Sequence, residues 1–190
     1  MSTIRAFIAI RLPPPVEQAL ADIGRALALT VPRGGVRWVR PEQIHLTLRF
    51  LGDTPVAQLD AIGKAMDAAV TDVLPFSLHL SGVGAFPNTR QPRVIWTGLD
   101  GEIKRLHSLK SALDEQLTLL GLPPEDKPFR AHLTLGRVKD QRAAEGLEWS
   151  VDVPPIELPV THIYLIESRL RPDGPVYTER HVSKLRYSKQ

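Results

Sequence analysis

Apolar and polar residues follow two different periods along this chain, and the changes of period predict its secondary structure. Residues 4–10, IRAFIAI, are rich in branched and aromatic side chains and predict a strand. After three prolines, apolar residues recur every three or four positions and predict a helix over about 15–29. A short strand is predicted at 36–39 and a longer one at 44–51. The first part of the chain is therefore expected to alternate between strands and a helix.

Two further helices are predicted by the same three- and four-residue spacing. A turn at Gly52-Asp53 leads into the first of them, about 55–70, in which Pro55 suits the first helical position. The other spans about 101–121 and stops at a glycine that is followed by two prolines.

The remaining apolar segments predict strands. Two-residue periodicity appears in FSLHLSGVGAF, in RVIWTGL and in FRAHLTLGRV, and extended runs follow near 160–168 and 175–182. The sequence contains no low-complexity tract and no obvious linker. We therefore expect one domain over residues 1–190.

The word HLTL occurs twice, at 45–48 and at 132–135, and both copies lie on predicted strands. Each copy follows a strand and a helix, so the order strand, helix, HLTL strand occurs once in 4–51 and once in 92–137. Chance alone rarely produces such a repeat in a chain with six histidines. The pattern suggests two similar lobes, which arose by duplication or by convergence.

Side-chain alternation along a strand gives each HLTL copy a polar face and an apolar face. The leucines can anchor the strand to the core, while the imidazole and the hydroxyl share the opposite face. By the same alternation, nearby polar residues should join them. The residues expected on the two polar faces are Gln43, His45, Thr47 and Arg49 in the first copy and Arg130, His132 and Thr134 in the second.

Composition narrows the class of protein without naming a partner. The chain is 43% hydrophobic and 24% charged, as is usual for a soluble globular protein. It has no cysteine, which excludes disulfides and thiolate metal sites, and no segment suited to a membrane span or a signal peptide. We expect a cytoplasmic monomer. The net charge of +3 and a pI near 9.4 permit an anionic partner such as nucleic acid.

Two histidines on facing strands suit the cleavage of a phosphodiester. One imidazole can deprotonate the attacking oxygen while the other protonates the leaving oxygen, and both tasks fit a group whose pKa is near neutrality. Threonine hydroxyls can bind non-bridging phosphate oxygens, and an arginine can stabilise the developing charge. We expect no cofactor and no metal, because HExxH and HxH are absent and a zinc site needs three ligands.

A purely structural explanation must be weighed against this chemistry. HLTL is also a good strand sequence, and a single copy would most simply carry a half-buried histidine. Two copies in equivalent places favour the catalytic interpretation. The other four histidines, for which we expect surface or core roles, are His79, His107, His162 and His181.

At these residues the chain resembles the 2H phosphoesterases, a family defined by two H-x-[TS]-x motifs. It is most similar to the RNA 2′,3′-cyclic phosphodiesterases, the LigT or ThpR group first described as 2′-5′ RNA ligases. The similarity includes RAFIAIRLP, WVRPEQIHLTLRFLG, PRVIWTGL, KPFRAHLTLGRV and IYLIESRL, together with the segment around Tyr177. It therefore covers most of the chain.

The resemblance implies an α+β fold of two similar lobes with pseudo-twofold symmetry. Each lobe would be an antiparallel sheet with flanking helices, and the two would form a central cleft. It also implies metal-independent hydrolysis of an RNA-terminal 2′,3′-cyclic phosphate to a 2′-phosphate. The roles that it implies are proton donor for His45, proton acceptor for His132 and phosphate binding for Thr47, Thr134 and Arg130.

Three more residues near the motifs bear on the site. Ala131 stands where relatives are expected to have proline, which changes the entry into the strand but removes no chemical group. Phe7 and Trp38 are aromatic candidates for stacking on the base, although a core role is the simpler expectation for each.

Other functions remain open from the sequence. The same histidines could serve a 2′-5′ RNA ligase, or a phosphodiesterase acting on small cyclic nucleotides. A different class of function is a non-catalytic RNA-binding module, which would bind RNA without turnover. Retention of both histidines and both threonines favours an enzyme, since binding alone would not need two titrating groups.

Overall fold

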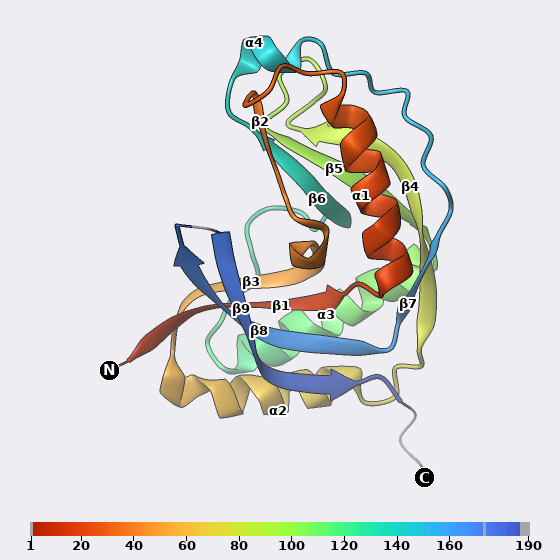
Figure 1. The fold of residues 1–190 in the computed structure, drawn as a ribbon. Coiled ribbons are helices and arrows are strands. Elements are labelled where there is room, and N and C mark those ends of the chain that lie inside the picture. Colours follow the sequence, from red (N-terminus) through yellow and green to blue (C-terminus); the bar gives the residue numbers. More distant parts are fainter. Residues whose placement is uncertain (1, 173, 187–190) are drawn as a thin grey trace.

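The computed structural model describes residues 2–172 and 174–186, and it contains two antiparallel sheets (Figure 1). Neighbouring strands of the first sheet follow the order β3-β1-β8-β9. Its strands are β1 (Thr3–Arg11), β3 (His45–Pro55), β8 (His162–Arg171) and β9 (Gly174–Lys184). The second sheet has the order β2-β6-β5-β4-β7. Its strands are β2 (Val36–Trp38), β4 (Phe76–Phe86), β5 (Val94–Gly101), β6 (His132–Val138) and β7 (Glu157–Val160).

Helices flank both sheets, as the sequence predicts for an α+β protein. The helical segments are α1 (Pro14–Ala28), η1 (Pro41–Gln43), η2 (Val56–Gln58), α2 (Leu59–Val70), α3 (Ile103–Leu119) and α4 (Gln141–Ala144). Helix α1 lies along the second sheet, whereas α2 and α3 lie beneath the first (Figure 1). The predicted fold of two antiparallel sheets with flanking helices is therefore confirmed.

Helices α1 and α3 each pack against the sheet that does not contain the preceding strand. Helix α1 follows β1 of the first sheet but contacts β6 of the second. Helix α3 follows β5 of the second sheet but contacts β3 of the first, through an ion pair between Asp114 and Arg49. As a result, one hydrophobic core includes Ile8 of the first sheet and Leu135 of the second, and it is continuous between them.

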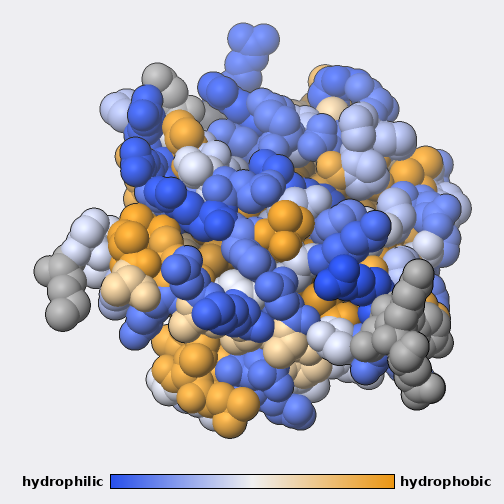
Figure 2. Space-filling model, turned by 90° about the horizontal axis from the view of Figure 1, so that it is seen from below, coloured by the Kyte–Doolittle hydropathy of each residue, from blue (hydrophilic) through white to orange (hydrophobic). Residues whose placement is uncertain are grey.

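The surface seen from below, where α2 lies, mixes hydrophobic and hydrophilic side chains (Figure 2). The hydrophobic ones form separate groups in this view rather than one continuous face. Most large apolar side chains are inside, in the core described above. Among the described residues, no helix is both long enough and apolar enough to cross a membrane.

The predicted helix at 55–70 begins later than expected. Strand β3 continues through Gly52 to Pro55 because it pairs with β1 as far as Thr3. Gly52 has a φ of +68°, so the backbone bends there without leaving the sheet. The α-helix then begins at Leu59, after the short η2 segment. Pairing with β1 has overridden the local turn signal.

Both HLTL strands have a bulge at the same place, after the motif threonine. In β3, Thr47 pairs with Ala9 and Arg49 with Ile8, which leaves Leu48 without a partner residue. In β6, Thr134 pairs with Trp96 and Gly136 with Ile95, so Leu135 is unpaired in the same way. A bulge shifts the alternation of every residue beyond it. The sequence prediction assumes uninterrupted alternation.

Arg49 is the residue most affected, and the prediction that it shares a face with His45 is wrong. The bulge directs Arg49 into the interior, where its side chain is 4% exposed. Its Nη1 donates to Asp114 at 2.9 Å, and its Nη2 donates to the carbonyls of Leu122 and Pro123. Lys110 pairs with the other carboxylate oxygen of Asp114. This buried network joins β3, α3 and the segment that leads toward β6.

Removal of Asp114 should destabilise the protein more than removal of Arg49. Asp114→Ala leaves two buried cations without a counter-charge, and we expect it to lower the free energy of unfolding by about 3–5 kcal/mol. Arg49→Ala leaves Asp114 paired with Lys110 and should cost about 2 kcal/mol. Urea denaturation measures both values. Asp22→Ala, which breaks the exposed Asp22–Arg25 pair, is the control and should cost less than about 1 kcal/mol. A cost at Asp114 equal to that at Asp22 would contradict the prediction.

Candidate active site

Each motif histidine is oriented by the backbone of its own chain segment. His45 Nδ1 lies 3.0 Å from the carbonyl oxygen of Gln43, and His132 Nδ1 lies 2.7 Å from that of Arg130. A carbonyl only accepts, so each Nδ1 donates and each neutral ring keeps its lone pair on Nε2. Both histidines thus use the same contact, with the carbonyl two residues earlier. This leaves Nε2 available for chemistry in each copy.

Aromatic rings hold the two imidazoles in place. Phe7 stacks on His45 with ring centroids 4.5 Å apart, and Tyr177 meets the same imidazole edge-on at 5.4 Å. In the second sheet, Phe86 meets His132 edge-on at 4.9 Å. Phe7, the predicted stacking candidate of the first sheet, therefore packs against a motif histidine. These contacts restrict rotation of both rings.

Burial and nearby positive charge lower the pKa of both motif histidines. Burial is the main cause that lowers the pKa of His45 to about 4, and the charge of His132 lowers it further. Burial also lowers the pKa of His132, with a contribution from the charge of Arg137. The backbone hydrogen bonds oppose these effects. Both imidazoles are thus weaker bases than usual in the free site.

The motif threonines have hydroxyls that are free to bind a ligand. Thr47 and Thr134 are half-buried, and each lies two residues from its histidine, before the bulge. Within the described part of the chain, neither hydroxyl has a hydrogen-bond partner. Each can therefore donate to an oxygen atom placed between the two sheets.

Arg130 lies beside His132, although it precedes the strand rather than belonging to it. Its carbonyl accepts from the imidazole, and its guanidinium lies over the Phe86 ring, 5.9 Å from the centroid. Phe86 in turn contacts His132. The expectation that Arg130 accompanies the second motif is met by these contacts.

Arg137 is a residue of the site that the sequence prediction missed. Uninterrupted alternation would place it on the face opposite His132, but the bulge at Leu135 reverses this. Its charge lowers the pKa of His132 in the second sheet and also that of Tyr177 in the first. Burial nevertheless raises the pKa of Tyr177 overall. Gly136, inside a strand, was the one signal in the sequence for such a bulge.

The same shift exposes Phe50 on the first sheet. Phe50 comes directly after Arg49, and it therefore corresponds to Arg137 in the second motif strand. Its side chain is 61% exposed, and its ring centroid lies 6.4 Å from that of Phe7. Gln43 precedes β3, and its Nε2 donates a hydrogen bond to the carbonyl of Pro175 in β9. These residues join the first motif to the β8–β9 hairpin that carries Tyr177.

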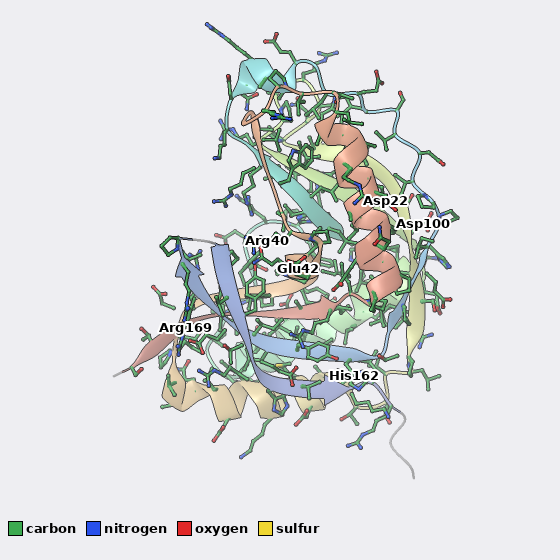
Figure 3. The ribbon with its side chains drawn as sticks, in the orientation of Figure 1. Asp22, Arg40, Glu42, Asp100, His162 and Arg169 are labelled. Atoms are coloured by element: carbon green, nitrogen blue, oxygen red, sulfur yellow. The ribbon has the colours of Figure 1, made fainter. Side chains whose placement is uncertain are left out.

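Other candidates lie away from the two motif histidines. Trp38 packs toward Gly136 on the opposite side of the second sheet and contacts the core, so it is a structural residue. His79 lies on β4 and His107 on α3, while His181 binds Asp67. His162 lies at the start of β8, in the lower half of the view (Figure 3).

The described residues contain no group of three or more His, Asp or Glu side chains that could hold a metal ion. Two shallow cavities, of about 290 Å³ and 490 Å³, both lie along α1. Neither of them includes a motif histidine. The strands of the two motif histidines, β3 and β6, contact each other, and His45 is close enough to His132 for the charge of His132 to act on it.

Comparison with known proteins points to one family. The family model described as "LigT like Phosphoesterase" matches residues 10–96 and 98–177. The RNA 2′,3′-cyclic phosphodiesterase of Methanothermobacter thermautotrophicus is 32% identical over 186 residues, with 96% of this chain and 99% of that protein covered. The protein of the same name from Thermotoga maritima is 35% identical over 176 residues, covering 92% and 91%.

Solved structures agree with the sequence comparisons. A protein of Thermus thermophilus matches with a TM-score of 0.80 and 33% identity, covering 98% of this chain and all of that one. Escherichia coli LigT in complex with 3′-AMP matches with a TM-score of 0.73 and 26% identity, covering 97% and 99%.

The low basicity of His45 can be measured directly. In the free protein we expect His45 to titrate near pH 4, because burial and the charge of His132 both oppose its protonation. Addition of inorganic phosphate should raise this pKa, since an anion beside the ring stabilises the imidazolium. Imidazole NMR signals, assigned with His45→Ala and His132→Ala, follow both curves. A free His45 that titrates at or above 6.5 would contradict the geometry.

The charge of Arg137 should hold down the pKa of His132. Arg137→Gln removes a positive charge that lowers the pKa of His132, so the pKa of His132 should rise. The same NMR titration measures this shift. Arg142→Gln on α4 is the control with the same change of charge, and it should leave His132 unchanged. An unaltered titration curve in Arg137→Gln would show that Arg137 does not act on the site.

Proposed function

Because this chain belongs to the family of LigT like phosphoesterases, we propose that it is an RNA 2′,3′-cyclic phosphodiesterase that forms 2′-phosphate ends. The observation that carries the proposal is the matched pair of motif histidines. Each is held by its own backbone carbonyl with Nε2 free, and each is accompanied by an unpartnered threonine hydroxyl in the described part of the chain. Two equivalent titratable groups are what in-line hydrolysis of a diester requires.

The reaction can be written on these residues with all atoms balanced. His132 Nε2 accepts a proton from water while the water oxygen forms a bond to phosphorus. The bond between phosphorus and the ribose 3′ oxygen breaks, and His45 Nε2 donates its proton to that oxygen. The product carries a 2′-phosphate and a free 3′ hydroxyl. Exchange of protons with solvent restores both histidines.

The low pKa of His45 in the free site means that the substrate must help to protonate the general acid. A general acid must carry a proton, but in the free site burial keeps His45 neutral at pH 7. The anionic cyclic phosphate supplies the missing negative charge, so its binding should protonate one of the two imidazoles. His45 takes the role of acid and His132 that of base by the family resemblance. Substrate binding and assembly of the acid are therefore one event.

The neighbouring polar groups complete the proposed site. Thr47 and Thr134 donate hydrogen bonds to non-bridging phosphate oxygens, one from each sheet. Arg130 supplies positive charge beside His132, as Arg137 does through its charge on the same imidazole. Such charge stabilises the pentacovalent transition state more than the ground state. No cofactor and no metal take part in this scheme.

The proposal also includes the setting in which the protein acts. We place it in the cytoplasm, as a monomer with RNA as its partner. The absence of cysteine is compatible with a reducing compartment. Escherichia coli LigT, a structural relative solved in complex with 3′-AMP, supports a nucleotide or RNA as the ligand of this protein.

The test uses a short RNA that ends in a 2′,3′-cyclic phosphate, in the presence of EDTA. We expect the parent protein to form only a 2′-phosphate terminus, identified by chromatography against both phosphate isomers. His45→Ala and His132→Ala should each lower turnover by about 10²–10⁴-fold, the usual contribution of a general acid or base. The pH profile of kcat should be bell-shaped, since one acid and one base are required.

His162→Ala is the matched control, because it removes an imidazole from β8 outside the motifs and should retain full activity. RNA binding without turnover in the parent protein would contradict the proposal and favour a binding module. Activity that is abolished by EDTA would contradict the metal-independent scheme.

A further inference from the structure

Arg37 extends the positive charge of the site onto the edge of the second sheet. It lies on β2 directly opposite Arg137 of β6. Residues opposite each other in an antiparallel pair place their side chains on the same face. Val36 and Trp38 point the other way, because a Cβ on Gly136 would meet both of them. Arg37 is therefore exposed on the face that carries His132 and Arg137.

The pairing of Arg37 with Arg137 has no stabilising role in the fold. Like charges directly opposite each other destabilise a sheet. Neither arginine forms an ion pair with any acidic residue in the described part of the chain, and neither guanidinium has a hydrogen-bond partner there. Both guanidinium groups consequently keep all their donors available. Two adjacent unpaired forks are suited to two neighbouring phosphates rather than to one.

The position of the pair gives the direction in which a second phosphate must lie. Arg137 acts on His132 and Tyr177, so it borders the place proposed for the cyclic phosphate. Arg37 is one strand further out, about 4.8 Å beyond it. A 2′,3′-cyclic phosphate lies at the 3′ end of RNA, so any further phosphate belongs to the 5′ side of the terminal nucleotide. The nearest is the one attached to the terminal 5′ oxygen.

From this geometry we propose that Arg37 binds the phosphate on the 5′ side of the terminal nucleotide, which makes the protein selective for RNA chain ends over free nucleoside 2′,3′-cyclic phosphates. The inference rests on the proposed function and adds a substrate determinant to it. The 5′ phosphate is bound by Arg37, whereas Arg137, on the neighbouring strand, lies beside the cyclic phosphate at the two histidines. Arg37 touches no reacting atom, and it acts by substrate binding alone.

The experiment compares three substrates, each with a 2′,3′-cyclic phosphate. They are a nucleoside, the same nucleoside with a 5′-phosphate, and a dinucleotide. We expect the parent protein to prefer the second and third over the first in kcat/KM. Arg37→Gln should reduce that preference by about 10-fold, through KM, as expected for loss of a charged hydrogen bond. Arg37→Lys should restore part of it, since lysine keeps the charge but not the fork.

Two further readouts separate binding from a structural effect. With the dinucleotide, the slope of log(kcat/KM) against log salt should become shallower by about 0.7 in Arg37→Gln, the value for one single-strand phosphate contact. The free energy of unfolding should be unchanged or higher, because the variant removes a like-charge pair. Arg25→Gln is the control with the same change of charge. Arg25, on α1, lines a cavity with Trp38 on the side of the second sheet opposite to Arg37, and its ion-pair partner Asp22 is labelled in Figure 3.

Each result has a distinct meaning. A parent protein that hydrolyses none of the three substrates would overturn the proposed function and this inference with it. A parent protein that hydrolyses all three with a preference unaltered in Arg37→Gln would overturn the inference alone. Equal losses on all three substrates would also overturn it, because Arg37 would then act on the cyclic phosphate or on the fold.

Discussion

The bulge that leaves one residue unpaired after each motif threonine determines which side chains face the site from the two sheets. The bulge follows the motif threonine in both copies, so the residue after HLTL points inward and the next one points into the site. In β3 this buries Arg49 and exposes Phe50, and in β6 it buries Gly136 and exposes Arg137. The same backbone feature thus serves two purposes. It provides the first sheet with an interior anchor and an aromatic surface, and the second sheet with a free cation.

This asymmetry suits a site that must bind an anion and a nucleoside at the same time. The half of the site built on the first sheet is aromatic, with Phe7, Phe50 and Tyr177 around His45. The half built on the second sheet is cationic, with Arg130 and Arg137 near His132. Aromatic rings bind bases by stacking, and arginine forks bind phosphates. Two strands with one motif therefore present different chemistry because the residues beyond the bulge differ.

The sequence predicts the parts of this structure that depend on local periodicity. The strands around both motifs, helices α1 and α3, and the common face of His45 with Thr47 all follow from spacing within a few residues. Features that depend on pairing with a distant strand do not. Pro55 carries a helix-start signal, yet β1 keeps it in the sheet. Arg49 was assigned to the wrong face, and Arg137 was missed, because a bulge is set by the partner strand and leaves little trace in sequence. Gly136, directly after the second HLTL motif, is a sequence signal for a bulge, whereas Arg49 at the equivalent position after the first motif is not.

The packing of α3 against the first sheet explains why the buried charge at Arg49 is tolerated. Arg49 extends from the first motif strand to Asp114 on α3, and also to the carbonyls of Leu122 and Pro123. The chain then continues to Phe129, whose ring contacts Lys110 of the same network, and to Arg130, whose carbonyl orients His132. A continuous path of contacts therefore connects the strand of His45 with the segment that fixes the tautomer of His132. If both histidines act on one phosphate, as we propose, they need a fixed separation, because catalysis is sensitive to errors of about 1 Å. A buried ion pair is a poor source of stability, but its directional contacts suit the task of holding two half-sites in register.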